Sequence, residues 1–212
     1  MTNAGVMRRG IVGLLAGALL LLFGNVAATA APAGTIVGVN GACFVVSAGA
    51  RTVVRLGQPV QIGDTVEVPA NGKLKLRLID GSVVSVASGS RMSVAALSTD
   101  GAGQRQDARL TLAEGLLRAV VAPVQHPSRF EVNTAVGTAS VRSTDWFVEA
   151  TGGAMQVGVL TGSVVMTSAA TRRSEIIPAR WGARLEAGRD PVPPRTWSEA
   201  EFQSVIGRTD VK

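Results

Sequence analysis

Alternation of branched apolar residues with small polar ones, broken by turn residues, dominates the sequence after position 31. The clearest stretch runs from Lys73 to Leu78, where leucines and basic residues fall on opposite faces of an extended strand. Asp80-Gly81 then turns the chain back into Ser82 to Val86, which predicts a hairpin. A period of two, with turn residues at about 8–12-residue intervals, predicts many short strands and an all-β fold.

Other segments give weaker signals. Asn71-Gly72 is typical of a hairpin turn because both residues tolerate a positive φ. The polar, glycine-containing stretch from 100 to 107 is expected to be a solvent loop. Residues 109–121 predict two strands around Gly115, with a helix over 112–120 as the alternative.

A four-residue phrase occurs twice. Gly162-Ser163-Val164-Val165 repeats Gly81-Ser82-Val83-Val84. A single short match is weak evidence for duplication, but it predicts that one unit, a turn followed by a strand, is used at both places.

The C-terminus changes from a strand pattern to a helix pattern. Ser198 and Glu201 have the spacing of a capping box, in which each side chain bonds the other residue's backbone. Trp197 before the cap and Phe202 after it form a hydrophobic staple. These signals predict a short helix from Glu199 to Ile206, which Gly207 ends.

The N-terminus has the features of an export signal. Arg8 and Arg9 precede an uncharged apolar run from Ile11 to Phe23, and Ala28-Thr29-Ala30 suits a signal peptidase. Cleavage is expected before Ala31. The alternative is an uncleaved anchor, but the run is shorter than the roughly 20 residues of a spanning helix. We therefore expect a periplasmic product without a transmembrane helix.

The chain divides into three predicted parts: a signal peptide over 1–30, a β domain over 31–188, and a proline-rich segment with the short helix over 189–212. The single cysteine, Cys43, allows no internal disulfide and is expected to be a small buried apolar residue. Stability must then come from a packed core.

Few residues suggest catalysis. The single histidine, His126, lies between prolines in an expected loop, and no nucleophile, phosphate-binding or metal-ligand motif is present. Asp64 and Asp80 each stand beside glycine and are expected to cap turns. The net charge of +6 is not gathered into a basic block, which argues against nucleic-acid binding. We expect no enzyme, no cofactor and no metal site.

Two kinds of surface remain as candidate contact sites. Lys73, Lys75 and Arg77 form a basic ladder that could bind an anionic glycan or simply face solvent. Trp181 is expected to be exposed, while Trp146, among valines and Phe147, is expected in the core. Trp181 could stack on a sugar or anchor a protein partner, and Trp197 and Phe202 at the start of the C-terminal helix are further candidate anchors.

Six phrases in order resemble the FecR domain, named for a regulator of ferric citrate uptake. They are Gly34 to Gly41, Val60 to Thr65, Leu76 to Ser82, Glu114 to Leu117, Phe130 to Thr134 with Val141 to Val148, and Val157 to Val164. Ser143 stands where the family prefers glycine, and Ala135 where it often has proline. The residues that carry the motifs are Gly34, Gly41, Gly63, Asp64, Asp80, Gly81, Ser82, Val141, Arg142, Thr144 and Gly162.

The resemblance covers residues 34 to about 187 and implies a rolled or stacked β-sheet domain that senses or relays a signal in the periplasm. Family members that control transcription hold a sigma factor with a cytoplasmic helical segment. Met1 to Met7 is too short for such a segment. We therefore expect a non-enzymatic interaction module with an envelope protein partner and no direct contact with a sigma factor. The alternative is a cell-wall or surface-glycan binder, and a hydrolase is a distant third.

Overall fold

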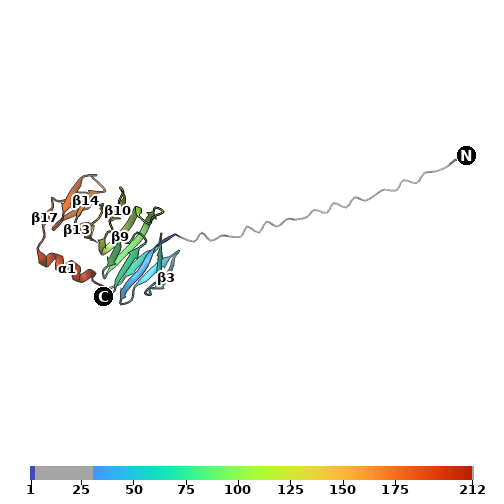
Figure 1. The fold of residues 1–212 in the computed structure, drawn as a ribbon, viewed down its shortest axis with the longest axis horizontal. Coiled ribbons are helices and arrows are strands. Elements are labelled where there is room, and N and C mark those ends of the chain that lie inside the picture. Colours follow the sequence, from blue (N-terminus) through green and yellow to red (C-terminus); the bar gives the residue numbers. More distant parts are fainter. Residues whose placement is uncertain (3–30, 212) are drawn as a thin grey trace.

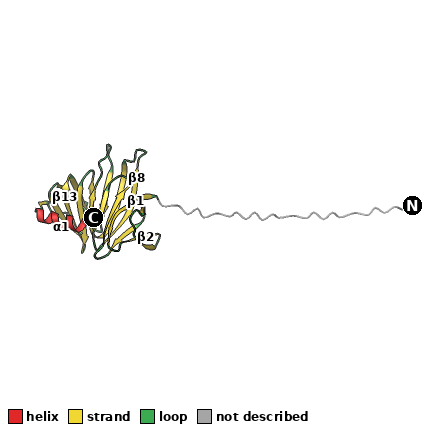
Figure 2. Cartoon of the chain, turned by 60° about the horizontal axis from the view of Figure 1, so that its bottom comes forward, coloured by secondary structure: helices red, strands yellow, loops and turns green. Residues whose placement is uncertain are grey.

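Two β-sheets stacked face to face make up the protein in the computed structural model, which describes residues 1–2 and 31–211 (Figure 1 and Figure 2). The helix α1 (Glu199–Thr209) lies against the outer face of one sheet, which we call the covered sheet. No described element packs on the outer face of the other, the open sheet, whose outward residues remain accessible. The prediction of an all-β fold with a short C-terminal helix is confirmed.

From edge to edge, the strands of the two sheets lie in the following orders. The covered sheet contains β4 (Pro59–Gln61), β1 (Pro32–Asn40), β6 (Lys73–Leu78), β7 (Val83–Val86), the second part of β9 (Arg105–Val120), β12 (Asp145–Thr151), β13 (Ala154–Thr161), β16 (Trp181–Glu186) and β17 (Arg195–Thr196). The open sheet contains β3 (Ala50–Val53), β2 (Phe44–Ser47), β5 (Thr65–Val68), β8 (Ser90–Thr99), the first part of β9, β10 (Arg129–Asn133), β11 (Gly137–Val141), β14 (Ser163–Ser168) and β15 (Ser174–Pro178).

The long strand β9 belongs to both sheets. Its residues up to Glu114 pair with β8, and those from Gly115 onward pair with β12. Gly115 has a φ of +91°, and a Cβ there would lie 2.1 Å from Ser90 Oγ, so glycine is needed where the strand changes sheet. The predicted pair of strands is thus one bent strand, and the helical alternative is wrong.

The turn at Asn71-Gly72 is not the predicted hairpin. It joins β5 of the open sheet to β6 of the covered sheet, and these two strands do not pair with each other. Asn71 has the expected positive φ of +68°. A Cβ on Gly72 would lie 3.3 Å from Cys43 Sγ, which shows that the turn packs tightly at the corner between the sheets. The hairpin predicted at Asp80-Gly81, between β6 and β7, is confirmed.

The repeated phrase is used in two different connections. Gly81 and Gly162 have φ values of +83° and +84°, and each precedes a strand, as predicted. Gly81 turns the chain within the covered sheet, whereas Gly162 passes it from β13 to β14 of the open sheet. The local turn is the same, but the surrounding topology is not duplicated.

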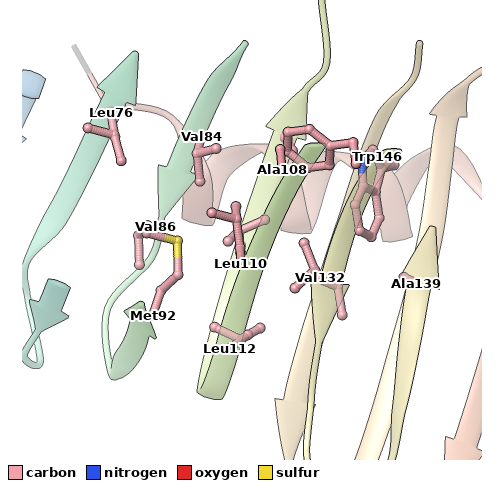
Figure 3. Packing of buried hydrophobic residues seen from close by; sticks show 14 of the residues in the cluster. Leu76, Val84, Val86, Met92, Ala108, Leu110, Leu112, Val132, Ala139 and Trp146 are labelled. Carbon is pink, nitrogen blue, oxygen red and sulfur yellow. The ribbon is translucent and has the colours of Figure 1, made fainter. Parts of the chain in front are cut away.

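The core fills the space between the sheets (Figure 3). Leu76 and Val84 of the covered sheet and Leu110 and Val132 of the open sheet are all fully buried. Trp146 has no exposed surface, which confirms its expected place in the core. Cys43 is also buried, and burial raises the pKa of its thiol, as suits a packing residue rather than a reactive one.

The predicted signal peptide and its cleavage site fall almost entirely in residues 3–30, outside the described residues. Over residues 1–2 and 31–211, no helix has the length and apolarity required to cross a bilayer. Export and cleavage before Ala31 remain predictions.

Candidate functional site

A buried arginine connects two of the motif segments. Arg105, at the start of β9, has no exposed surface and lies 2.6 Å from a carboxylate oxygen of Asp80. Its guanidinium also donates to the backbone oxygen of Arg142 at 2.9 Å and to that of Ala122 at 3.2 Å. The Asp-Gly-Ser turn and the Val-Arg-Ser-Thr segment, far apart in sequence, therefore meet at this side chain.

The predicted loop over 100–107 is wrong at its end, because β9 begins at Arg105 and only the tip of the segment is a turn. Asp80 does cap its own turn, as predicted, accepting from the backbone N–H and the hydroxyl of Ser82. Its second role, as the partner of Arg105, had no signal in the local sequence. The alternation of Ala108, Leu110 and Leu112 did not indicate it either, because Arg105 is out of phase with these residues across a register shift between β8 and β9.

The remaining motif residues hold turns and close approaches between strands. Asp64 accepts from the backbone N–H of Gln61 at 2.8 Å, as expected of a turn cap. Thr144 is buried and donates to the backbone oxygen of Ser163. A Cβ on Gly34 would lie 2.4 Å from the backbone oxygen of Arg77, and Gly41, Gly63 and Gly162 have positive φ. Val141 belongs to the core.

The basic ladder is largely engaged within the protein. Lys73 Nζ donates to the backbone oxygens of Gly207 at 2.6 Å and Asp210 at 3.2 Å, and Lys75 Nζ donates to that of Val211 at 2.8 Å. These carbonyls lie at the negative end of α1, where cations are favourable. Arg77 alone of the three is exposed. The ladder thus anchors the C-terminus, a role that the sequence pattern did not reveal.

The start of α1 follows the predicted pattern. Ser198 caps the helix in a capping box with Glu201, and Glu201 also pairs with Arg195 at 2.6 Å. The hydrogen bond from Arg195, reinforced by the Ser198 backbone, lowers the pKa of Glu201 to about 2. The helix does not end at Gly207 but continues to Thr209, and Lys73 of β6 binds the carbonyl oxygen of Gly207 in its last turn.

The apolar face of α1 is buried against the covered sheet. Phe202 has no exposed surface and packs edge-on against Phe147 of β12, with ring centroids 6.2 Å apart. Trp197 lies 5.1 Å from the same ring, and Leu116 of β9 completes the cluster. Phe202 is therefore inaccessible to a partner while α1 is docked. Trp181 is 37% exposed, in keeping with the expected exposed position.

No catalytic constellation is formed by the described residues. The ring of His126 is half-buried beside Asp100, with Nε2 and Oδ2 3.3 Å apart. It lines a cavity of about 270 Å³ with Ser128 and Ser143, but among the described residues it forms no hydrogen bond with either hydroxyl. The backbone N–H of Gln104 is the main cause of a lowered pKa at Asp100. Across residues 1–2 and 31–211, no three His, Cys, Asp or Glu side chains are grouped to hold a metal ion.

One sheet edge stands out as a contact surface. All four residues of β3 are exposed, and β3 pairs with β2 on one side only. Just beyond it, Leu56 is 68% exposed, and Val53 within it is 61% exposed. Figure 1 places β3 at the rim of the molecule, away from β14 and β17. Sequence reasoning proposed exposed edges in general but did not identify this one.

The fold is similar to that of a candidate anti-sigma factor from Parabacteroides distasonis ATCC 8503, known from crystal structures at 1.65 and 2.50 Å resolution. The chains are 16% identical, with a TM-score of 0.56 over 67% of this chain and 64% of the first structure. This chain thus spans somewhat less than two thirds of that protein's length.

No curated protein matches the sequence. The family model described as "FecR protein" matches residues 64–165, which contain all but the first of the six motif phrases in whole or in part. The match includes both segments that meet at Arg105. Residues 64–165 of this chain therefore match the FecR domain.

Proposed function

We propose that this chain is a non-enzymatic signal-relay module that is exported to the periplasm and binds a protein of the cell envelope. The FecR domain supports a regulatory role. The observation that carries protein binding is the open edge of β3, since an unpaired edge can accept a strand from another protein. The Ala28-Thr29-Ala30 sequence after a short apolar run supports export.

Glycan binding by the basic ladder has less support. Lys73 and Lys75 donate to carbonyls at the end of α1, which leaves Arg77 as the accessible cation of the three. A sugar polymer would have to displace these contacts. If the chain is exported, an effect on transcription must pass through another envelope protein, so we expect no direct sigma-factor contact.

A pull-down and a sedimentation assay distinguish protein binding from glycan binding. The tagged protein is incubated with detergent-solubilised envelope, and in parallel it is sedimented with purified cell-wall material. We expect enrichment of an envelope protein and no co-sedimentation. Co-sedimentation that Arg77→Ser weakens would favour the glycan alternative, and capture of a sigma factor by the exported protein would overturn the proposal.

Localisation has its own test. Cell fractionation and N-terminal sequencing should recover a periplasmic protein that begins at Ala31. Full-length protein in the membrane fraction would instead support the uncleaved anchor.

A further inference from the structure

We propose that the edge of β3 binds an extended segment of the partner that is acidic and apolar, adding a strand to the open sheet. This inference rests on the proposed function and specifies the chemistry of its partner. It is carried by the backbone of β3, by two exposed apolar side chains, and by an excess of arginine around them.

The backbone of β3 offers free pairing groups. The N–H of Val54 donates to the oxygen of Cys43, so the hydrogen-bonded pairs along β2 and β3 fall at Thr52 and Ala50. In an antiparallel ladder the intervening residues direct their N–H and C=O groups away from the partner strand. The backbone N–H and C=O groups of Arg51 and Val53 thus point away from β2, and an incoming strand could pair with them.

The other three sheet edges are less suited to pairing with an incoming strand. Those of the covered sheet are β4 and β17, with 3 and 2 residues. The far edge of the open sheet is β15, and its outward positions include Pro178, which has no N–H to donate. Very short strands and prolines are common ways of protecting an edge from pairing. β3 carries neither form of protection within its 4 residues.

The surface beside β3 is apolar at two points. Val53 and Leu56 line a shallow groove of about 810 Å³ together with Thr52, Arg55, Gly57 and Gln58. Exposed apolar side chains along a free edge invite association, because burying them on a partner is favourable. The incoming segment is therefore expected to place apolar residues over Val53 and Leu56.

The charges beside β3 favour an acidic segment. Arg51 packs over the ring of Phe44, and Arg51 and Arg91 pair with different oxygens of Glu67. Glu114 lies beside them, so the three arginines at 51, 55 and 91 exceed the two carboxylates of Glu67 and Glu114. Arg55 is exposed and forms no salt bridge with any residue in the described part of the chain. A second copy pairing through β3 would bring these arginines together, and like charges in contact are unfavourable.

Two synthetic peptides test the inference on the intact protein. One combines valine and leucine with aspartate, and the other has lysine in place of each aspartate. Amide hydrogen exchange of Arg51 and Val53 is followed during titration. The acidic peptide should bind and slow exchange at both amides, while the lysine peptide should bind about tenfold more weakly or not at all.

Proline substitutions supply the matched variants. Val53→Pro removes an outward N–H of β3 and should weaken binding of the acidic peptide about tenfold, whereas Ile176→Pro, at an equally exposed apolar position of β15, should not. Circular dichroism checks that both remain folded, and Arg55→Glu, which alters no backbone group, should also weaken binding. Equal binding of both peptides, no binding of either, or β3-mediated dimers would overturn the inference. If envelope capture nevertheless persists, only the inference fails and the proposed function stands.

Discussion

Arg105 and Asp80 have no exposed side-chain surface, and each is the other's charge partner. Replacing Arg105 by methionine leaves the Asp80 carboxylate buried without its cation. We expect a loss of about 3–5 kcal/mol in the free energy of unfolding. Urea denaturation measures it. The double variant Arg105→Met with Asp80→Leu should recover a large part of the lost free energy of unfolding. If Arg105→Met alone were as stable as the wild type, the buried ion pair with Asp80 would be refuted.

The second residue-scale prediction concerns the two faces of β6. Leu76 is fully buried and Arg77 is exposed, although they are neighbours in sequence. Leu76→Asp places a charge in the core and should prevent folding or cost several kcal/mol, as should Val141→Asp. Arg77→Ser, the matched control, should change stability by no more than about 0.5 kcal/mol. Thermal melts compare the three, and equal effects would show that the strand register is wrong.

At the scale of secondary-structure elements, the sequence predicted the features that depend on neighbouring residues. The face of β6, the capping box of α1 and the turn at Gly81 each depend on residues close together in the chain. Contacts between segments far apart in the chain could not be predicted from neighbouring residues. Lys73 and Lys75 resembled a solvent face because the carbonyls they bind lie more than 130 residues away. The sheet-changing turn at Asn71-Gly72 resembled a hairpin for the same reason.

Gly115 allows a direct test of the bent strand. Gly115→Ala must accommodate a φ of +91° and a Cβ 2.5 Å from Ser90 Cα, so the ladder at the crossing has to shift. We expect a loss of several kcal/mol. Gly153→Ala has a φ of +75° and no atom within 4 Å of the new Cβ, so it should show only the backbone strain of about 1–2 kcal/mol. Similar losses in both variants, measured in urea, would contradict a packing role for Gly115.

The docking of α1 should respond to acid. Pairing with Arg195 lowers the folded-state pKa of Glu201 to about 2, below its usual value of 4.5. The stabilisation is therefore present above the usual pKa and is lost as the pH falls from about 4.5 to about 2. Protection factors at α1, which correct for the pH dependence of intrinsic amide exchange, should fall over this range before those of the core do. Glu201→Gln should reduce that pH dependence, and an unchanged response would rule Glu201 out as its source.

At the scale of the whole molecule, the central question is whether the sandwich unfolds as one unit. A single cluster of buried residues extends from Ala33 of β1 to Leu185 of β16, and it includes side chains from both sheets. β9 also pairs with β8 on one side of Gly115 and with β12 on the other, so neither sheet can lose this strand alone. A continuous core and a shared strand both favour cooperative unfolding.

We therefore expect one urea transition for residues 31–196, seen at the same midpoint by far-UV circular dichroism and by the fluorescence of the buried Trp146 in a variant with Trp181→Phe and Trp197→Phe. α1 is the exception, because the smaller cluster of Ala87, Leu116, Phe147, Phe202 and Val205 is separate from the main core. Its release should precede the main transition and appear as faster hydrogen exchange at Phe202 and Val205 alone. Two resolved transitions within the sheets would show instead that the halves on either side of β9 fold independently.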